Sequence, residues 1–340
     1  MNPLVSIIIV NWNSRENLKE CLESLFKISY KNYEVIMVDN GSTDDSVKFV
    51  EKKFPKVIIV KSKVNLGFAG GNNLGFRESR GKYILLLNND TIVPPNFLGK
   101  LVDFMKKRSD VGIVQPRILF HRPNTDLHHK INSVGSFFLS TGFLYHLDYG
   151  KKDYKKNTPY EILSAYGACF LARKSLIDKI GLFDDNYFAY FEETDLSQRV
   201  WLSGSKVMVD PSSTIYHKGA KTSQKLPTAF IQYHSFKNRL QTYLKNLSFT
   251  NLFKIFIPHL LICEVSSILY FFVGKPDYTL AIQKAIFWNL LNLEKILKKR
   301  HITQEFRRIE DDEFISKLTK KVKLRYYYFL SRGELEKYND

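Results

Sequence analysis

The stretch Leu4-Val5-Ser6-Ile7-Ile8-Ile9-Val10 opens the pattern that decides the fold. Its unbroken run of β-branched and aliphatic side chains predicts a strand buried on both faces, as in a parallel sheet. The run is too short for a signal peptide, has no basic residue before it, and continues into polar Asn11 rather than a small-residue cleavage site. We therefore interpret it as the first strand of an α/β domain.

Helical and strand patterns alternate after this first strand. Residues 17–26 carry apolar side chains at helical spacing, and residues 34–39 form a second strand pattern. A turn rich in N-cap residues then precedes a helix over residues 47–54, and two further strands are predicted at 57–60 and 83–87. This alternation predicts an open, mostly parallel α/β sheet with its ligand site at the carboxyl ends of the strands.

Polar clusters follow three of the predicted strands. Asp39 ends the second strand, where it could accept hydrogen bonds from a nucleobase or ribose, or merely cap the next helix. The glycine-rich segment 65–73 allows close backbone approach to a ligand, but it has neither the dinucleotide fingerprint nor the lysine of a phosphate-binding loop. Asp90 follows the fourth strand and is well placed for a divalent cation that bridges phosphates.

Three carboxylates, Glu192, Glu193 and Asp195, stand directly behind the aromatic run 187–191. Crowded carboxylates raise one another's pKa, and apolar neighbours raise it further, which suits one of them to act as a general base near neutral pH. The alternative interpretation is a solvated acidic first turn of a helix, where acids favour the positive end of the helix dipole.

Taken in order, these clusters resemble the inverting glycosyltransferases of family 2, which have the GT-A fold. Within that family, the chain is most similar to a rhamnosyltransferase-like branch that builds bacterial and archaeal surface polysaccharides. The resemblance covers roughly the first two thirds of the chain without a missing block. The motifs that carry it are residues 5–12, 38–44, 65–72, 87–91, 167–174, 181–184, 192–196 and 217–223.

The resemblance implies a role for each of the acidic positions. Asp39 would hold the base or ribose of a nucleoside diphosphate sugar, and Asp90 would ligate the Mg²⁺ or Mn²⁺ that neutralises the diphosphate. His217 matches a histidine that contributes to the metal or diphosphate site. Glu193 aligns with the general base that takes the proton of the acceptor hydroxyl, and Glu192 is its rival, because the sequence alone does not show which of the two acids points into the cleft.

The resemblance also implies a set of donor-binding residues. Gly167 and Ala168 would line the pocket beneath donor and acceptor, where a larger side chain would intrude. The other expected donor contacts are Asn11, Asn65, Gly67, Gly71, Asn72 and Asn88.

Two departures from the family pattern concern the reacting groups. The usual pair of acids flanking one residue is replaced by Asn88-Asn89-Asp90, so Asn88 would contact the nucleotide as an amide. The base position is Glu193 where aspartate is more usual, and its extra methylene extends the reach of the carboxylate but lowers its preorganisation.

Composition predicts a cytoplasmic enzyme that is peripheral on the inner face of the cell membrane. Three widely separated cysteines, Cys21, Cys169 and Cys263, favour a reducing compartment, and the net charge of +17 favours an anionic surface. We expect a catalytic domain over residues 1–225 and a helical, basic, membrane-associating region over residues 226–340.

The apolar stretch 252–273 bears on how that region meets a membrane. Lys254, Pro258, His259 and Glu264 interrupt it, so an interfacial helix is expected rather than a clean span. The alternative is that these helices only pack on the catalytic domain. The basic clusters that favour a membrane surface are residues 236–239, 298–300, 307–308 and 320–321.

Two other function classes fit part of the pattern. A sugar-nucleotide nucleotidyltransferase would carry a glycine-rich loop with a basic residue straight after the first strand, where this chain has Asn11-Trp12-Asn13-Ser14. A non-catalytic basic module that binds nucleotides or nucleic acid is the second, but no nucleic-acid motif is present and the strand ends are acidic. The expected partners are therefore a dTDP- or UDP-sugar donor, with rhamnose favoured, and a glycan or lipid-linked acceptor.

Overall fold

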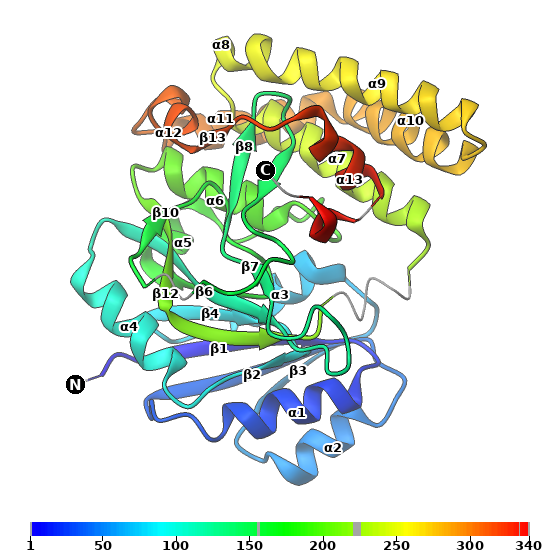
Figure 1. Ribbon diagram of the computed structural model, residues 1–340. Helices are drawn as coiled ribbons and strands as arrows, with labels where there is room; N and C mark the ends of the chain where they lie inside the picture. The colour runs from blue at the N-terminus through cyan, green and yellow to red at the C-terminus, as the bar shows by residue number, and fades with distance from the viewer. Residues whose placement is uncertain (1, 155–156, 220–225, 333, 339–340) are drawn as a thin grey trace.

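A computed structural model describes residues 2–154, 157–219, 226–332 and 334–338, and it is built around one large mixed sheet (Figure 1). Within these residues the sheet has ten strands, in the order β10-β12-β6-β11-β4-β1-β2-β3, with β5 and β7 pairing at its margins. The strands are β1 (Val5–Asn11), β2 (Tyr33–Asn40), β3 (Ile58–Ser62), β4 (Tyr83–Leu87), β5 (Thr91–Ile92), β6 (Val111–Phe120), β7 (Ile131–Ser133), β10 (Tyr160–Glu161), β11 (Cys169–Arg173) and β12 (Lys206–His217).

The strands β3, β2, β1 and β4 are parallel neighbours, as the sequence pattern predicts. β11 lies antiparallel to both β4 and β6, which makes the sheet mixed, whereas β12 is parallel to β6. The prediction of an α/β fold with a mostly parallel sheet is confirmed.

Alternate residues of β1 face two different hydrophobic clusters. Ile7 and Ile9 pack with α1 (Arg15–Leu25), α2 (Ser46–Lys53) and α4 (Phe97–Lys107). Ile8 faces the opposite side, with α3 (Gly67–Arg77), α5 (Lys174–Ile180) and α6 (Glu192–Leu202). Burial on both faces explains why the first strand is an unbroken apolar run. All three cysteines are buried and unpaired.

The C-terminal residues form helices that share the core of the sheet domain. Tyr243, Phe314 and Tyr326 belong to the same hydrophobic cluster as Ile8 and Leu196. A second sheet, β13-β8-β9, joins β13 (Thr319–Lys320) to β8 (Ser136–Leu139) and β9 (Leu144–His146). Residues after 225 are therefore integrated with the domain rather than appended to it. The helices are α7 (Thr228–Asn246), α8 (Phe249–Asn251), the π-helical turn η2 (Leu252–Phe256), α9 (Ile257–Phe272), α10 (Pro276–Leu291), α11 (Leu293–Glu305), α12 (Asp311–Leu318) and α13 (Leu324–Arg332), with a short 3₁₀ turn η3 (Leu335–Lys337).

Several basic residues that we assigned to a membrane surface are structural instead. Lys237 is 4% exposed and its ammonium donates to the Asn186 carbonyl at 2.6 Å. Arg300 donates to the carbonyls of Leu244 and Leu247 at the end of α7. Arg307, in the same way, donates to the Asn246 carbonyl at 2.6 Å. The expectation that the clusters 236–239, 298–300 and 307–308 face headgroups is therefore wrong for Lys237, Arg300 and Arg307, because each donates to a carbonyl inside the fold.

Candidate active site

A cavity of about 420 Å³ opens at the carboxyl ends of β1 and β4, where the sequence places the ligand site. It brings together residues from segments far apart in the chain. Of the residues expected from the sequence, its lining includes Asn65, Gly67, Asn88, Asp90, Gly167, Ala168, Glu192, Glu193 and His217.

Asp90 and His217 lie next to each other in the lining of this cavity. The distance from His217 Nε2 to Asp90 Oδ1 is 3.1 Å, and both side chains are buried. The other ring nitrogen, Nδ1, lies 2.7 Å from the amide oxygen of Asn132, which can only accept, so Nδ1 donates there. Nε2 has no hydrogen-bond partner among the described residues and is directed toward the Asp90 carboxylate.

This pair fits a divalent cation. A lone pair and a carboxylate oxygen at such a distance repel each other unless a proton or a metal ion lies between them. The described residues contain no group of three or more histidine, cysteine or acidic side chains placed to hold a metal. A cation here would thus complete its coordination with oxygens from outside the protein, as Mg²⁺ and Mn²⁺ do at diphosphates.

The first turn of α6 places Glu192 and Glu193 at the cavity. Burial raises the pKa of Glu193 to about 7, and burial together with the charge of Glu193 raises the pKa of Glu192 further still. Glu192 is 5% exposed and its Oε2 has no hydrogen-bond partner among the described residues. Burial and the neighbouring charge therefore favour the protonated form of Glu192, whereas Glu193 can exchange a proton near neutral pH.

Gly167 lies beside Glu193. A Cβ atom built on Gly167 would lie 3.9 Å from Glu193 Cδ and 3.5 Å from the Phe68 ring. A Cβ atom at these distances makes ordinary van der Waals contacts, and a longer side chain would occupy the space in front of the carboxylate. The expected need for a small residue at this position stays a prediction.

The backbone just before these acids is strained. Tyr190 and Phe191 have φ angles of +73° and +75°, a left-handed conformation that costs roughly 1–3 kcal/mol for each non-glycine residue. The Asn238 side chain, from α7, donates to the carbonyls of Ala189 and Tyr190 at 2.9 and 2.7 Å. Helix α7 thereby holds the turn that aims the start of α6 at the cavity.

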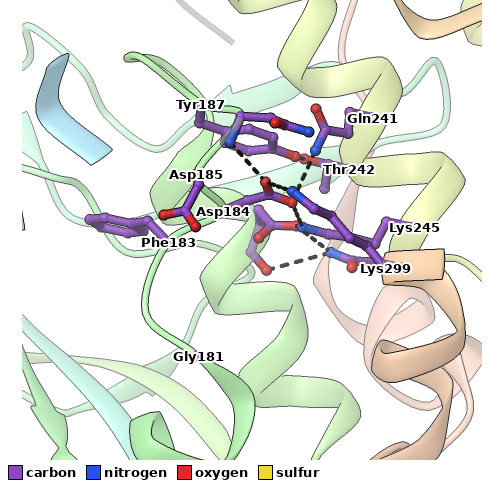
Figure 2. Close-up of polar contacts among 12 residues, drawn as sticks. Gly181, Phe183, Asp184, Asp185, Tyr187, Gln241, Thr242, Lys245 and Lys299 are labelled. Carbon is purple, nitrogen blue, oxygen red and sulfur yellow. Dashed lines mark hydrogen bonds and ion pairs between the residues drawn. The ribbon is translucent and has the colours of Figure 1, made fainter. Parts of the chain in front are cut away.

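A buried charge cluster anchors the same loop (Figure 2). Asp184 accepts from Gln241 and Lys245, each at 2.9 Å, and is paired with Lys299 of α11. Burial alone would raise the pKa of Asp184, but Lys245 and Lys299 lower it far below its ordinary range. The carboxylate is therefore charged and fixes the loop after Gly181 to α7 and α11.

Four of the expected donor contacts lie outside the cavity lining. Asn11 and Asp39 are register neighbours at the ends of β1 and β2, and Asp39 accepts from the Ser42 amide at 3.2 Å. Gly71 packs against Val10, since a Cβ atom there would lie 2.7 Å from Val10 Cγ1. The Asn72 side chain donates to a carbonyl in its own helix. Gly71 is in close contact with Val10 and the Asn72 side chain is hydrogen-bonded within α3. Donor-binding roles for all four residues stay predictions.

The motif 217–223 is described only to Gly219, and its residues 220–223 lie outside the described residues. The structure adds cavity residues that we did not assign from the sequence. Trp12 and Tyr166 adjoin assigned motif residues, which was the available signal, and the Tyr166 ring lies 5.9 Å from the His217 ring. The others are Val10, Asn40, Phe68, Asn89, Phe188, Ala189, Tyr190, Leu226 and Ile231.

Curated relatives of the chain are glycosyltransferases. The hexosyltransferase Agl10 of low-salt glycan biosynthesis, from Haloferax volcanii, is 25% identical over 69% of this chain and 74% of its own length. The N-acetylglucosaminyl-diphospho-decaprenol L-rhamnosyltransferase of Mycobacterium tuberculosis is 22% identical over 69% of this chain and 82% of its own length. An uncharacterized glycosyltransferase of Haemophilus influenzae is 31% identical, but the match covers only 32% of this chain and 35% of the relative.

Solved structures of similar fold are also glycosyltransferases. GalNAc-T7 with UDP, GalNAc and Mn²⁺ superposes with a TM-score of 0.58 and 17% identity, over 72% of this chain and 48% of that one. The mannosyltransferase PcManGT of Pyrobaculum calidifontis, with GDP-Man and Mn²⁺, has a TM-score of 0.52 and 14% identity, over 90% and 86%. The GT-A fold expected from the sequence is confirmed.

The model of the family described as glycosyl transferase family 2 matches residues 6–181, more than half of the chain. That stretch includes the Asp90 and Gly167 motifs, whereas the two acids at the start of α6, Glu192 and Glu193, lie beyond its end at residue 181. The chain belongs to glycosyltransferase family 2, and it is a glycosyltransferase.

Proposed function

We propose that the enzyme transfers a sugar, with inversion, from a nucleoside diphosphate donor to a hydroxyl group of an acceptor bound in this cavity. The observation that carries the proposal is Glu193, a carboxyl with a pKa of about 7 that lines the same cavity as the facing pair Asp90 and His217. A base and a cation site in one cavity are what an in-line displacement needs.

In this proposal Glu193 is the general base. Its carboxylate takes the acceptor hydroxyl proton while that oxygen forms a bond to the anomeric carbon from the face opposite the diphosphate. The bond between that carbon and the diphosphate oxygen breaks, and the nucleoside diphosphate leaves with the bonding electron pair. Glu192, which stays protonated, keeps a second negative charge away from the departing anion.

Asp90 and His217 would hold the divalent cation. The bound cation supplies Lewis-acid stabilisation of the diphosphate leaving group. Because His217 contributes an imidazole nitrogen and Mg²⁺ prefers an all-oxygen shell, Mn²⁺ is the better fit. Both similar structures contain Mn²⁺, which supports this choice.

The proposed substrates are a dTDP- or UDP-sugar and a lipid-linked or polysaccharide acceptor in surface glycan synthesis. Rhamnose and a lipid-linked acceptor are supported by the name of the mycobacterial relative, a rhamnosyltransferase with a decaprenol-linked substrate. A role in surface glycans is also supported by a match to the O-antigen biosynthesis protein RfbC of Myxococcus xanthus, 26% identical over 63% of this chain and 17% of that protein.

We further propose that α9 and α10 lie on the inner face of the cell membrane. The helical stretch Phe249–Phe272 is long and apolar enough to cross a membrane. Its most apolar 18 residues have a mean hydropathy of 1.8, and only 22% of that segment is buried inside the protein. The polar side of this helix faces the protein, because His259, Cys263 and Ser267 are buried. Apolar side chains such as Leu261 and Ile268 are 61% and 55% exposed. An apolar outer face above a polar inner one suits a lipid interface.

Incubation of the purified enzyme with dTDP-rhamnose, UDP-glucose and GDP-mannose, each with Mn²⁺ and a glycolipid acceptor, tests the proposal. We expect transfer from one donor, and NMR of the product should show an anomeric configuration opposite to that of the donor. Retained configuration would overturn the inverting role of Glu193, and absence of both transfer and donor hydrolysis with every donor would overturn the proposed site.

A further inference from the structure

A second hollow lies between α7 and α10, outside the catalytic cavity. It has a volume of about 580 Å³ and is lined mainly by aromatic and aliphatic side chains. Those that carry the argument are Phe230 and Tyr233 of α7, and Leu280, Phe287, Trp288 and Leu291 of α10. We call it the α7–α10 groove.

The α10 side of the α7–α10 groove is continuous with the exposed apolar face of α9 and α10. Leu280, Phe287 and Leu291 line the groove and are also 53%, 61% and 70% exposed. Figure 1 shows α9 and α10 side by side, on the side of α7 that faces away from the sheet. A chain leaving a membrane at this face would enter the groove without crossing a polar surface.

The α7 side of the α7–α10 groove adjoins the catalytic cavity. The Phe230 ring lies 5.5 Å from the ring of Phe188, which lines that cavity, and Ile231, the next residue of α7, lines it as well. A single layer of aromatic side chains therefore separates the two hollows. A ligand seated in the groove would have its far end within reach of the cavity that holds Glu193.

We propose that the α7–α10 groove holds the polyprenyl chain of a lipid-linked acceptor, whose sugar is then presented to Glu193. The proposal rests on the proposed function, and it adds the site where the lipid part binds. Two features support this occupant, namely the apolar lining that joins membrane face to cavity, and the exposed cation Lys284 beside the groove, which suits a phosphate linker. Asp277, the acid at the same groove, lies in the first turn of α10.

The proposal can be tested by filling the groove with a bulky side chain and measuring the kinetics of transfer. Ala229 is half-buried and lines the groove, so Ala229→Trp would occupy it, whereas Thr228→Trp adds the same bulk at the exposed neighbouring position. Two acceptors with the same sugar are compared, one on farnesyl diphosphate and one on methyl diphosphate. We expect Ala229→Trp to raise KM for the farnesyl acceptor about tenfold or more, with the methyl acceptor and kcat unchanged. Thr228→Trp should match the parent.

The possible outcomes separate this inference from the proposed function. If the parent enzyme uses both acceptors equally well, or Ala229→Trp impairs both equally, no chain binds in the groove and the inference is wrong. If neither acceptor is glycosylated and no donor is hydrolysed, the proposed function itself has failed.

Trp288 allows a direct measurement of binding, because it lines the groove. Titration with farnesyl phosphate should change the tryptophan fluorescence of the parent, and this change should be absent from Trp288→Phe. In Ala229→Trp the Kd for farnesyl phosphate should rise about tenfold. Inorganic phosphate should give no such change. An equal response to dodecyl phosphate would show a general contact with lipid tails instead of a polyprenyl site, and would overturn the proposal.

Discussion

Lys245 Nζ lies 2.8 Å from Asp195 Oδ1, and this buried ion pair fastens α7 to the helix that begins with Glu192 and Glu193. The same ammonium lies 2.9 Å from Asp184, on the loop that leads into that helix. Burial would raise the pKa of Asp195, but the charges of Lys245 and Arg199 hold it below its ordinary value. One lysine thus orders both sides of the strained turn before the candidate base.

We predict that Lys245→Met lowers the free energy of unfolding by about 3–5 kcal/mol, because it leaves two buried carboxylates without their shared cation. Lys298→Met is the matched control, since Lys298 and its partner Glu294 are 73% and 81% exposed, and such pairs contribute about 0–1 kcal/mol. Urea unfolding of both variants measures the difference. Equal midpoints would show that the buried pair is dispensable.

The same carboxylates predict how stability depends on pH. The pKa values of Asp184 and Asp195 are lowered in the folded protein, so their contribution is complete above the unfolded aspartate value of about 3.9. The contribution is lost as the pH falls below that value. Acid unfolding of the parent should therefore be steeper than that of Lys245→Met, in which, of the neighbouring cations, only Lys299 and Arg199 still lower the two pKa values.

The catalytic rate should depend on pH near neutrality, and not in the acid range where stability changes. A general base works only when deprotonated, and burial raises the pKa of Glu193 to about 7. We predict that kcat/KM rises tenfold per pH unit below about 7 and is flat above it. Glu193→Gln should lose about 10²–10⁴ in kcat, and the pH dependence should disappear with it.

Glu192→Gln is the control for this assignment. Burial and the neighbouring charge raise the pKa of Glu192 and favour its neutral form, which a neutral amide resembles in charge. We expect Glu192→Gln to keep most of the activity, and its kcat/KM should still fall below a pH of about 7. A larger loss in Glu192→Gln than in Glu193→Gln would make Glu192 the base.

The sequence predicted the sheet well because its signal is local. The apolar run 4–10 and the polar residues at the strand ends can be recognised from residues adjacent in the sequence. Asp90, Gly167 and Glu193 could therefore be assigned to one site. The fate of α7 was not predictable in the same way. A lysine such as Lys245 is solvated in most helices, and only the fold brings Asp184 and Asp195 to it. The strained turn at Tyr190 likewise depends on a distant residue, Asn238.

Removal of the cation should stop transfer. With chelator we expect no turnover, and Mn²⁺ should restore it more effectively than Mg²⁺ because His217 offers a nitrogen ligand. Asp90→Ala should abolish transfer and weaken Mn²⁺ binding in the presence of UDP, which electron paramagnetic resonance measures directly. Normal Mn²⁺ binding by Asp90→Ala, with an unchanged melting temperature, would place the cation elsewhere.

The membrane face can be tested by introducing charge into it. Leu261→Glu and Ile268→Glu place carboxylates among exposed apolar side chains of α9, so binding to vesicles containing phosphatidylglycerol should fall about tenfold or more. Val64→Glu is the control, because Val64 is equally exposed, at 61%, but lies in the loop after β3. If all three variants sediment with vesicles as the parent does, α9 makes no contact with lipid.

Gly67 shows how closely the glycine-rich segment is fitted to the catalytic loop. Its φ is +73°, and a Cβ atom there would lie 2.1 Å from the Phe188 carbonyl oxygen. Gly67→Ala must therefore displace residues 188–191 and with them the start of α6, so we expect a loss of stability of about 1–3 kcal/mol and a larger loss of activity. Gly99→Ala, in the first turn of α4 with open space around it, should instead stabilise by up to about 0.5–1 kcal/mol. Thermal unfolding and transfer assays on both variants decide the point, and normal activity in Gly67→Ala would mean that the loop before Glu192 need not be held in this conformation.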